Sequence, residues 1–437
     1  MAVTEGQLVP IGPFPAGANN IALETSVPAR SFRKGVNVNV TDDGKVRRRE
    51  GYTKIIDAYE PRCLYGTGKR AFFAIEGDLY AAAASRGPDG LPMLADVQLI
   101  YSGLDPAGEL SYTLIEPDVF VSDGQSNLRI GPDNFVSPWS LPTLDFPLVT
   151  TTEGGSLEAG RYFVAIAAKA MSGEEGPLTD PMVIEVPVDG KMFIALPTSI
   201  PAGTARVAIY MSKPNGKELL LLTAVPASAG QVTVGKQRLG RPPVSQDLDP
   251  MPPCRFSAVW NGRLLVAYGA AVVWSEPNQF ALTQSAYNFL PFSEDITMLA
   301  AIDTAGGFFV GLGSKTYFVV GANPADASLT LAYSAGVVPG TLVMVPGARL
   351  PFDDPPDMPV PMWMATNGVF CVGFMDGSVH PLTETRFVGA HAEAGAAMFD
   401  QRNGQNRYVA TLRNPSENNF AMSDQITAEV VRNGIPT

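Results

Sequence analysis

Short apolar stretches separated by turn residues recur along the chain, and this repetition constrains the fold more than any other feature. Residues 71–84 and 112–132 each read as two strands joined by a tight turn. Four later stretches repeat the pattern of strand, Gly- or Asn-containing turn and second strand, at 256–277, 299–321, 363–382 and 397–412. Alternating apolar residues bounded by Gly, Asn, Asp and Pro are typical of β-hairpins. The chain therefore repeats one β-rich unit.

The spacing of these units indicates how they assemble. The later units begin roughly 35 to 60 residues apart, the range of meander sheets that stack on neighbours as propeller blades do. The 43 glycines and 38 prolines among 437 residues favour frequent turns over long helices. We predict an all-β fold, a β-propeller, with an ordinary β-sandwich meander as the alternative.

A segment with a different pattern of apolar and turn residues, from about Leu148 to Val234, interrupts the repeat. It holds about seven short stretches with strand-like alternation, which resemble the strands of a fibronectin type III-like sandwich. Its expected elements are a strand with inward-pointing Tyr162, Val164 and Ile166, a turn at Gly176-Pro177, and a later strand carrying Val207, Ile209 and Met211. We predict an inserted sandwich domain.

Proline-rich stretches before and after this segment set the predicted domain boundaries. Residues 1–146 are expected to form an N-terminal arm and the first blades, residues 147–240 the sandwich, and residues 241–437 the remaining blades and a C-terminal segment. The arm, up to about Tyr52, has the composition of a segment that docks on a partner. In the last part, residues 346–361 read as a projecting loop, and Ser423 is the expected cap of a helix that ends at Asn433-Gly434.

Residue usage argues against most enzyme chemistry. The three cysteines, Cys63, Cys254 and Cys371, lie far apart in sequence, and their spacing indicates neither a disulfide framework nor a zinc site. The two histidines, His380 and His391, are expected to be structural. No nucleophile elbow or zinc-protease motif occurs. We predict a protein that is not an enzyme and binds no metal or cofactor, although a pair of carboxylates for glycoside cleavage would meet only in three dimensions.

Two further motifs have plain structural readings. GLGSKT at residues 311–316 has the glycines of a phosphate-binding loop, but Ser314 breaks the Gly-Lys adjacency and the stretch joins two strands. Asp353, Asp354 and Asp357 could suggest calcium, but the interleaved prolines prevent the chain from wrapping an ion. We expect a hairpin in the first case and a solvated acidic loop in the second.

One basic run stands out in an acidic chain. The protein has 31 Lys and Arg against 43 Asp and Glu, a formal net charge of −12. Lys45, Arg47, Arg48 and Arg49 are the candidate site residues. They could contact phosphates of a nucleic acid, but without interleaved aromatic residues an interface or a salt-bridged strand is the simpler reading.

The N-terminus lacks a basic start followed by an apolar core, and the longest apolar run, residues 264–274, is about half the length needed to cross a bilayer. The sequence thus predicts a soluble protein with no secretion signal and no membrane-spanning segment.

Three pieces of the chain resemble structural proteins of tailed bacteriophages. Residues 17–56 contain G-A-N-N, a G-V-N-V-N-V strand, a D-D-G turn and R-R-E-G-Y. GRLLVAYGAAVVWSEPNQF at 262–280 resembles a blade element of tail nozzle and tail tubular proteins. RYVATL at 407–412 and SDQITAEVVRNG at 423–434 resemble the C-terminal segment of the same family.

This resemblance implies a structural subunit of a phage tail. It implies a homo-oligomeric ring of six copies, a nozzle or hub that closes the channel and then conducts viral DNA, with a tail adaptor and tail fibre or spike proteins as partners. It places the protein in the virion after assembly in the host cytoplasm. A neutral or acidic channel wall would also let DNA slide, because it lacks the phosphate contacts that retain DNA.

Two other classes of function stay open. One is a receptor-binding or glycan-degrading propeller at the tail tip, and the other is a bacterial β-propeller that serves as a binding module. The position along the tail is open as well, because the spacing between the three matching pieces departs from the family pattern.

Overall fold

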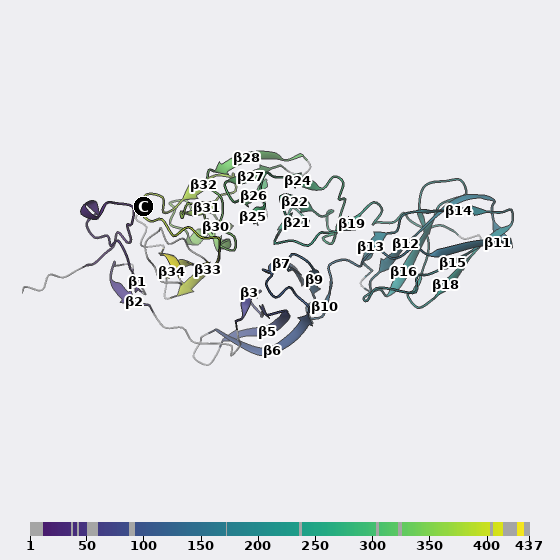
Figure 1. Ribbon diagram of the computed structural model, residues 1–437, viewed down its shortest axis with the longest axis horizontal. Coiled ribbons are helices and arrows are strands. Elements are labelled where there is room, and N and C mark those ends of the chain that lie inside the picture. The colour runs from purple at the N-terminus through teal and green to yellow at the C-terminus, as the bar shows by residue number, and fades with distance from the viewer. Residues whose placement is uncertain are drawn as a thin grey trace, which may run out of the picture. The chain divides into compact units, whose positions relative to one another are not determined.

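The computed structural model describes residues 12–35, 38–41, 43–49, 60–86, 92–171, 173–235, 238–302, 306–321, 326–402, 405–413 and 426–431. The described residues form strands, turns and short 3-10 segments that include η1 (Glu24–Ser26) and η3 (Gly347–Arg349). None of the helices in these ranges has the length and apolarity that crossing a bilayer requires. Figure 1 labels the elements.

The chain divides into two compact units. Unit 1 comprises residues 1–57, 269–271 and 291–437, and unit 2 comprises residues 58–268 and 272–290. Each unit contains antiparallel sheets in which consecutive strands are neighbours. Outside the inserted domain, five sheets in the described residues have four strands, and the sheet β33–β35 has three. This repetition of four-stranded meanders is how a β-propeller is built, so the predicted all-β propeller fold is confirmed.

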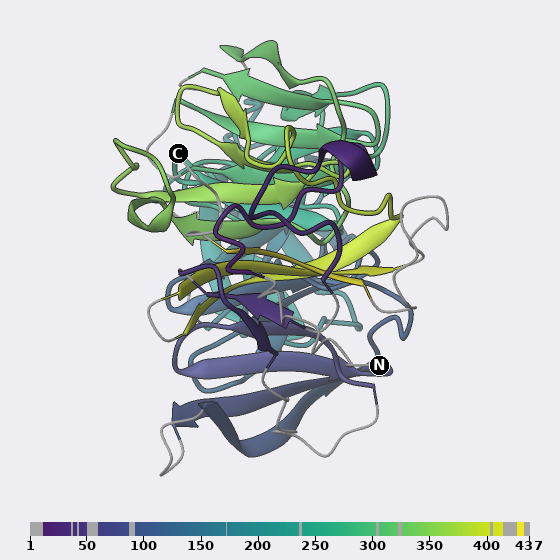
Figure 2. The same cartoon turned by 90° about the vertical axis from the view of Figure 1, so that its left-hand side faces the viewer.

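Unit 2 begins with two such sheets. The first has the strands β3 (Arg62–Gly66), β4 (Arg70–Ile75), β5 (Asp78–Arg86) and β6 (Pro92–Ser102). The second has β7 (Ser111–Ile115), β8 (Asp118–Ser122), β9 (Asn127–Ile130) and β10 (Val136–Pro138). Figure 2 shows the blue strands of the first sheet side by side. One apolar core joins the two sheets, with Phe72 and Leu79 from the first and Val119 and Ile130 from the second.

A third blade of unit 2 follows the inserted domain. Its strands are β20 (Phe256–Trp260), β21 (Arg263–Tyr268), β22 (Ala271–Trp274) and β24 (Phe289–Pro291), with the short pair β19 (Asp249–Pro250) and β23 (Leu282–Thr283) beside it. The hydroxyl of Ser257 on β20 lies 2.7 Å from the hydroxyls of both Ser111 and Thr113 on β7. These contacts fix the second and third blades against each other.

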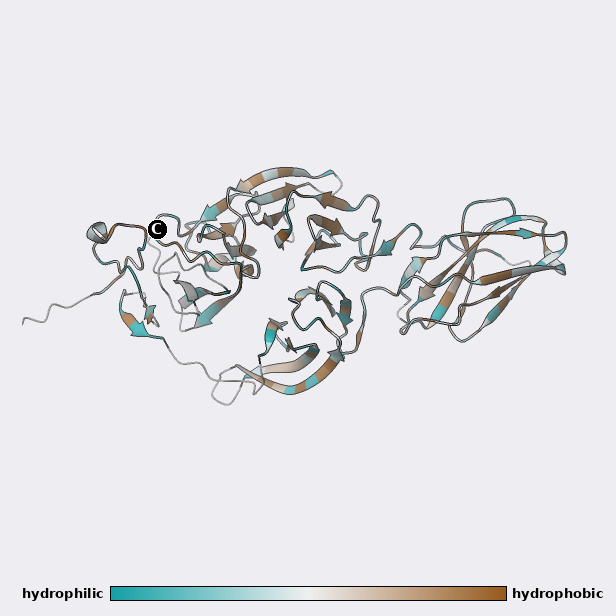
Figure 3. Ribbon diagram, in the orientation of Figure 1, coloured by the Kyte–Doolittle hydropathy of each residue, from teal (hydrophilic) through white to brown (hydrophobic). Residues whose placement is uncertain are grey.

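The turn between β20 and β21 illustrates why the strands form where the sequence predicts. Asn261 and Gly262 both have positive φ, 48° and 69°. A two-residue hairpin turn with positive φ at both positions matches the twist of its strands, and Asn-Gly is the preferred sequence there. Along β21 the apolar residues from Leu264 to Ala267 are all buried. Figure 3 shows the apolar character of the strands in brown.

The inserted domain is a sandwich of two sheets. One sheet has the order β11 (Leu148–Leu157), β15 (Gly190–Ala195), β18 (Gln231–Val234). The other has β13 (Glu175–Leu178) and β14 (Met182–Val186) paired with β12 (Gly160–Lys169), followed by β16 (Arg206–Met211) and β17 (Leu220–Pro226). The two-sheet sandwich is as predicted, while its closer resemblance to fibronectin type III domains stays a prediction.

The sandwich core lies between the two sheets. The predicted inward-pointing residues of β12, Tyr162, Val164 and Ile166, are at most 2% exposed and belong to this core. Leu141 and Leu144 belong to it as well, although they precede the span 147–240 predicted for the domain. The proline-rich stretch before β11 is therefore part of the domain's packing and more than a linker.

The expected turn at Gly176-Pro177 was wrong. Both residues lie in strand β13, at the edge of its sheet. Proline lacks a backbone N–H, and an edge strand leaves one side unpaired, so Pro177 fits there. The chain reverses just before, where the Gly173 N–H donates to the Ala170 carbonyl (3.0 Å).

Unit 1 contains the last three sheets. They are β25 (Ile296–Ala301), β26 (Gly307–Leu312), β27 (Thr316–Val320) and β28 (Ser328–Tyr333); then β29 (Val343–Pro346), β30 (Pro359–Met364), β31 (Phe370–Gly373) and β32 (Val379–Pro381); then β33 (Ala394–Arg402), β34 (Gln405–Arg413) and β35 (Ile426–Val431). Phe309 and Trp363, with ring centroids 5.6 Å apart, join the first and second of these sheets. Phe370 and Tyr408, 5.4 Å apart, join the second and third.

The helix predicted to start at Ser423 was wrong for the residues that the structure describes. Residues 426–431 form strand β35, which pairs with β34 from Leu412↔Ile426 to Arg407↔Val431. The stretch is rich in β-branched residues, which lose rotamer freedom in a helix and fit a pleated sheet. Ser423 and Asn433-Gly434 lie outside the described residues.

The N-terminal part of unit 1 has a two-stranded sheet, β1 (Val38–Val40) and β2 (Val46–Arg48). Before it, the Asn20 side chain donates to the Val388 carbonyl (2.7 Å) and accepts from the Val388 N–H (3.0 Å). The predicted arm therefore contacts its own unit near residue 388. Docking of the arm on another protein stays a prediction.

Candidate functional site

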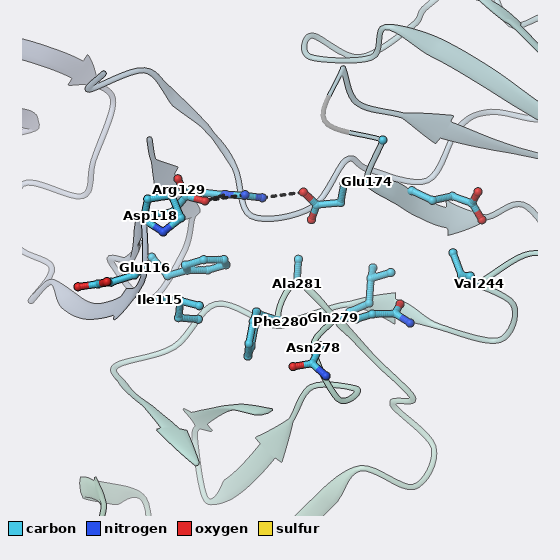
Figure 4. A pocket seen from close by; sticks show the side chains of 15 residues that line it. Ile115, Glu116, Asp118, Arg129, Glu174, Val244, Asn278, Gln279, Phe280 and Ala281 are labelled. Atoms are coloured by element: carbon cyan, nitrogen blue, oxygen red, sulfur yellow. Dashed lines mark hydrogen bonds and ion pairs between the residues drawn. The ribbon is translucent and has the colours of Figure 1, made fainter. Parts of the chain in front are cut away.

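A cavity of about 490 Å³ in unit 2 lies where the inserted sandwich meets the blades. It is lined by β7–β9 residues and the β7–β8 turn, by the Gly173–Glu175 stretch of the sandwich, and by the segment before and within β23 (Figure 4). Its side chains are mixed in character, with Ile115, Phe120 and Phe280 beside Asn278 and Gln279. Cavities of this size and composition are typical of ligand sites.

A bridge of three charged residues crosses one side of this cavity. The Arg129 guanidinium on β9 contacts the Asp118 carboxylate on β8 (2.6 Å) and the Glu174 carboxylate of the sandwich (2.6 Å). Figure 4 shows Arg129 extended toward Glu174. The guanidinium also lies 5.7 Å from the ring centroid of Phe120. Although burial opposes the charged form, the two carboxylates raise the pKa of Arg129.

Behind the bridge, the adjacent Glu175 is buried in a separate network. Its carboxylate accepts hydrogen bonds from the Tyr210 hydroxyl (2.5 Å) and the Ser245 hydroxyl (3.0 Å). The Lys169 ammonium lies 3.5 Å away and balances its charge. Burial is the main cause, and the Glu175 hydrogen bond the second, of a raised pKa for Tyr210. Glu175 thus anchors the segment after the sandwich, which carries Ser245, to the sandwich itself.

The arrangement suits binding better than catalysis. The carboxylates of Asp118 and Glu174 are both engaged by the same arginine. Asn278 and Gln279 offer amide donors and acceptors, and Phe280 offers an aromatic face. The described residues include no group of three or more metal-ligating side chains.

The predicted site residues, Lys45 and Arg47 to Arg49, all lie on or beside β2. Lys45 pairs with Asp43 (2.5 Å) across the turn, and this pair holds the pKa of the Asp43 carboxyl well below its usual range. Arg49 donates to the Asn39 side chain (3.4 Å). Arg47 and Arg48 are exposed, and within the described ranges neither guanidinium group has a hydrogen-bonding or ionic partner. The run forms a basic hairpin in unit 1 and is not part of the cavity.

The remaining motifs lie apart from the cavity. GLGSKT joins β26 to β27, as expected, and the Glu294 carboxylate accepts from the Ser314 hydroxyl (2.5 Å) in this turn. A carboxylate on the loop leaves it unsuited to a phosphate. Asp353, Asp354 and Asp357 are exposed on the loop between η3 and β30.

The histidines and cysteines lie in ordinary surroundings. His391 Nδ1 is 2.8 Å from the Thr366 carbonyl oxygen, and His380 packs edge-on against Phe352. The three cysteines are free thiols. Burial raises the pKa of Cys254 to about 12 and that of Cys371 to about 12, so both thiols stay protonated and unreactive near neutral pH.

Sequence reasoning did not find the Arg129 bridge. Arg129 and Glu174 are 45 positions apart and belong to different domains. The available signal was weak: a Gly-Glu-Glu-Gly stretch at 173–176. Which arginine would face it depended on packing.

Comparisons with known proteins give no close relative. No protein-family model matches the chain, and no curated protein matches it. Among solved structures, it is similar to BBS1N in complex with ARL6DN, at 14% identity and a TM-score of 0.31, over 82% of this chain and 90% of that one.

Two further solved structures give similar values. One is a protein from Lactobacillus plantarum, at 11% identity and a TM-score of 0.35, over 82% of this chain and 94% of that one. The other is the N-terminal domain of Nup159, at 8% identity and a TM-score of 0.27, over 81% of this chain and 73% of that one. None of these likenesses bears on function.

Proposed function

We propose that this protein is a non-enzymatic structural subunit of a bacteriophage tail. In this proposal, copies of the chain form a ring, a nozzle or hub that closes the tail channel and then conducts viral DNA. The ring has six copies, contacts a tail adaptor and tail fibre or spike proteins, and belongs to the virion after assembly in the host cytoplasm.

The motif at residues 262–280 carries the proposal. It corresponds to one continuous piece of a blade, from the Asn261-Gly262 turn through β21 and β22 to Phe280 at the cavity. The motif therefore spans a unit of structure, and this supports a shared origin with the tail proteins that it resembles. The net charge of −12 also suits a channel subunit, because an acidic wall does not retain DNA.

A second candidate is a receptor-binding or glycan-degrading propeller at the tail tip. The cavity favours it, because Phe280, Asn278 and Gln279 place an aromatic face beside amides, and saccharides are bound by such combinations of apolar and hydrogen-bonding groups. The pairing of Asp118 and Glu174 with Arg129 argues for binding without cleavage.

Native mass spectrometry and negative-stain electron microscopy of the full-length chain test the first proposal. We expect a closed ring with a central opening and no retention of labelled duplex DNA at physiological salt. Antibodies to the chain should label the distal end of phage tails produced by the host that carries the gene. A monomer that releases saccharide from host envelope polysaccharide would instead establish the second candidate as an enzyme.

A further inference from the structure

The β1–β2 hairpin presents a basic edge. β2 pairs with β1 on one side, with Val38 opposite Arg48 and Asn39 opposite Arg47, and its other side has no strand partner among the described elements. Successive side chains of a strand point to opposite faces. Arg47 and Arg48 therefore flank the open edge, one on each face.

The turn of this hairpin is held in place. The Thr41 hydroxyl donates to the Asp43 carboxylate, the Lys45 ammonium pairs with Asp43, and the Phe14 N–H donates to the Gly44 carbonyl (2.6 Å). Asp43 thus binds Thr41 and Lys45 rather than an arginine of the hairpin, and the guanidinium groups of Arg47 and Arg48 are left for an external partner. Because the backbone of the hairpin is already ordered, their binding costs side-chain rotamer freedom but little backbone entropy.

An acidic loop on the same unit is built in a comparable way. Between η3 and β30, Asp353, Asp354 and Asp357 are exposed, and in the described ranges none has an ionic or hydrogen-bonding partner. The loop's apolar residues hold it to the blade: Leu350 is buried, and the Phe352 ring packs edge-on against Phe374 at 5.2 Å.

The backbone of this loop is also fixed. The Gly347 N–H donates to the Met358 carbonyl (3.0 Å), which closes the base of the loop. Pro351, Pro355 and Pro356 restrict φ between its ends. The backbone that carries the carboxylates is thus fixed, as the backbone of the hairpin is.

We infer that the β1–β2 hairpin of one copy docks on the 351–357 loop of a second copy, with Arg47 and Arg48 pairing with Asp353 and Asp354. The inference rests on the proposed ring and names its contact. Complementary charge favours a second copy as the partner, because the acidic loop of the same chain matches the basic hairpin. The net negative charge of the chain disfavours binding of DNA at this edge.

The contact is of a kind that closes rings. It joins two different surfaces of the same chain, and such head-to-tail contacts generate a closed ring when the rotation from one copy to the next closes, and an open filament when it does not. Within one chain, the described residues show no hydrogen bond or ion pair between the side chains of Arg47 or Arg48 and those of Asp353 or Asp354. The hairpin and the loop are both anchored to their own surroundings, so each remains available to a neighbour.

Charge reversal in the full-length chain tests the contact. We expect Arg47→Glu/Arg48→Glu and Asp353→Arg/Asp354→Arg each to weaken self-association at least about tenfold in sedimentation velocity, because like charges then oppose each other. The chain with all four changes, and a one-to-one mixture of the two double variants, should regain assembly. Lys213→Glu/Lys217→Glu, an equal charge change at exposed positions of the sandwich, should leave assembly unchanged.

The other outcomes separate this inference from the proposed function. A ring that persists in both double variants would overturn the hairpin contact and leave the ring itself in place. A wild-type chain that stays monomeric at low salt and high concentration would overturn both. Binding of labelled duplex DNA that disappears only in Arg47→Glu/Arg48→Glu, without effect on assembly, would assign the hairpin to nucleic acid and overturn the inference.

Discussion

The guanidinium of Arg129 lies 2.6 Å from the carboxylate of Glu174, and this contact joins strand β9 of a propeller blade to the inserted sandwich. The same guanidinium binds Asp118 on the neighbouring strand β8. Arg129 is therefore held by its own blade and reaches the sandwich from a fixed position. The cavity beside this bridge means that few other side chains fill the junction at that point.

Removal of the Arg129 charge should loosen this junction. We expect Arg129→Gln to lower the free energy of unfolding by about 1–2 kcal/mol, because Asp118 would be left without its ionic partner in a mostly buried position. Glu174→Gln should cost less, about 0.5 kcal/mol, because Glu174 is more exposed. Urea unfolding of both variants measures the difference. Arg161→Gln, on the exposed face of the sandwich, is the control, and an equal loss in all three would contradict a specific bridge.

Stability should fall in alkaline solution because of the two buried thiols. Burial raises the pKa of Cys254 and Cys371 from 9.0 to about 12 in the folded protein. Above pH 9 the unfolded chain loses protons that the folded chain keeps, so the free energy of unfolding decreases as pH rises from 9 towards 12 and is unaffected by these groups below pH 9.

Each thiol should contribute a slope of up to about 1.4 kcal/mol per pH unit in this range. Urea unfolding at pH 8, 9.5 and 10.5 measures it. Cys254→Ala should lower stability at every pH and also reduce the slope between pH 9.5 and 10.5. If the slope of the variant equals that of the wild type, the thiol does not titrate as described.

Gly340 should not tolerate a side chain. Its φ is +80°, and a Cβ placed there would collide with the Gly395 carbonyl oxygen. We expect Gly340→Ala to destabilise the protein by about 2–4 kcal/mol, from backbone strain together with the displaced contact between two blades. Gly124→Ala is the matched control, because its φ is +85° and nothing lies within 4 Å of the added carbon. It should cost only the strain of about 1–2 kcal/mol, and thermal unfolding distinguishes the two.

The inserted sandwich should fold by itself, and more stably when it includes the residues before β11. Leu141 and Leu144 are buried in its core, and burial of a leucine side chain is worth about 1.5–3 kcal/mol. A fragment of residues 139–248 should therefore show a cooperative thermal transition at a higher temperature than residues 146–240. Equal transition temperatures would show that the two leucines do not stabilise the isolated domain, and a disordered longer fragment would show that the sandwich depends on the blades.

The sequence by itself determined the strands and turns of this protein. Apolar alternation in β12 predicted Tyr162, Val164 and Ile166 in the core, and Asn261-Gly262 predicted a hairpin turn. These features are local, because side-chain alternation follows from the period of a strand and positive φ follows from the residue type. Repetition of such local units was then enough to predict blades, because a single meander cannot bury both of its faces.

Only the tertiary structure decided whether segments with weak strand signals form strands, and which side chains make contact between domains. Residues 426–431 form a strand because β34 provides a partner, and Pro177 lies in a strand because β13 is at a sheet edge. Arg129 meets Glu174 because the sandwich packs beside β9. Each of these outcomes depends on contacts between residues that are distant in the chain, and the local periodicity of the sequence does not predict such contacts.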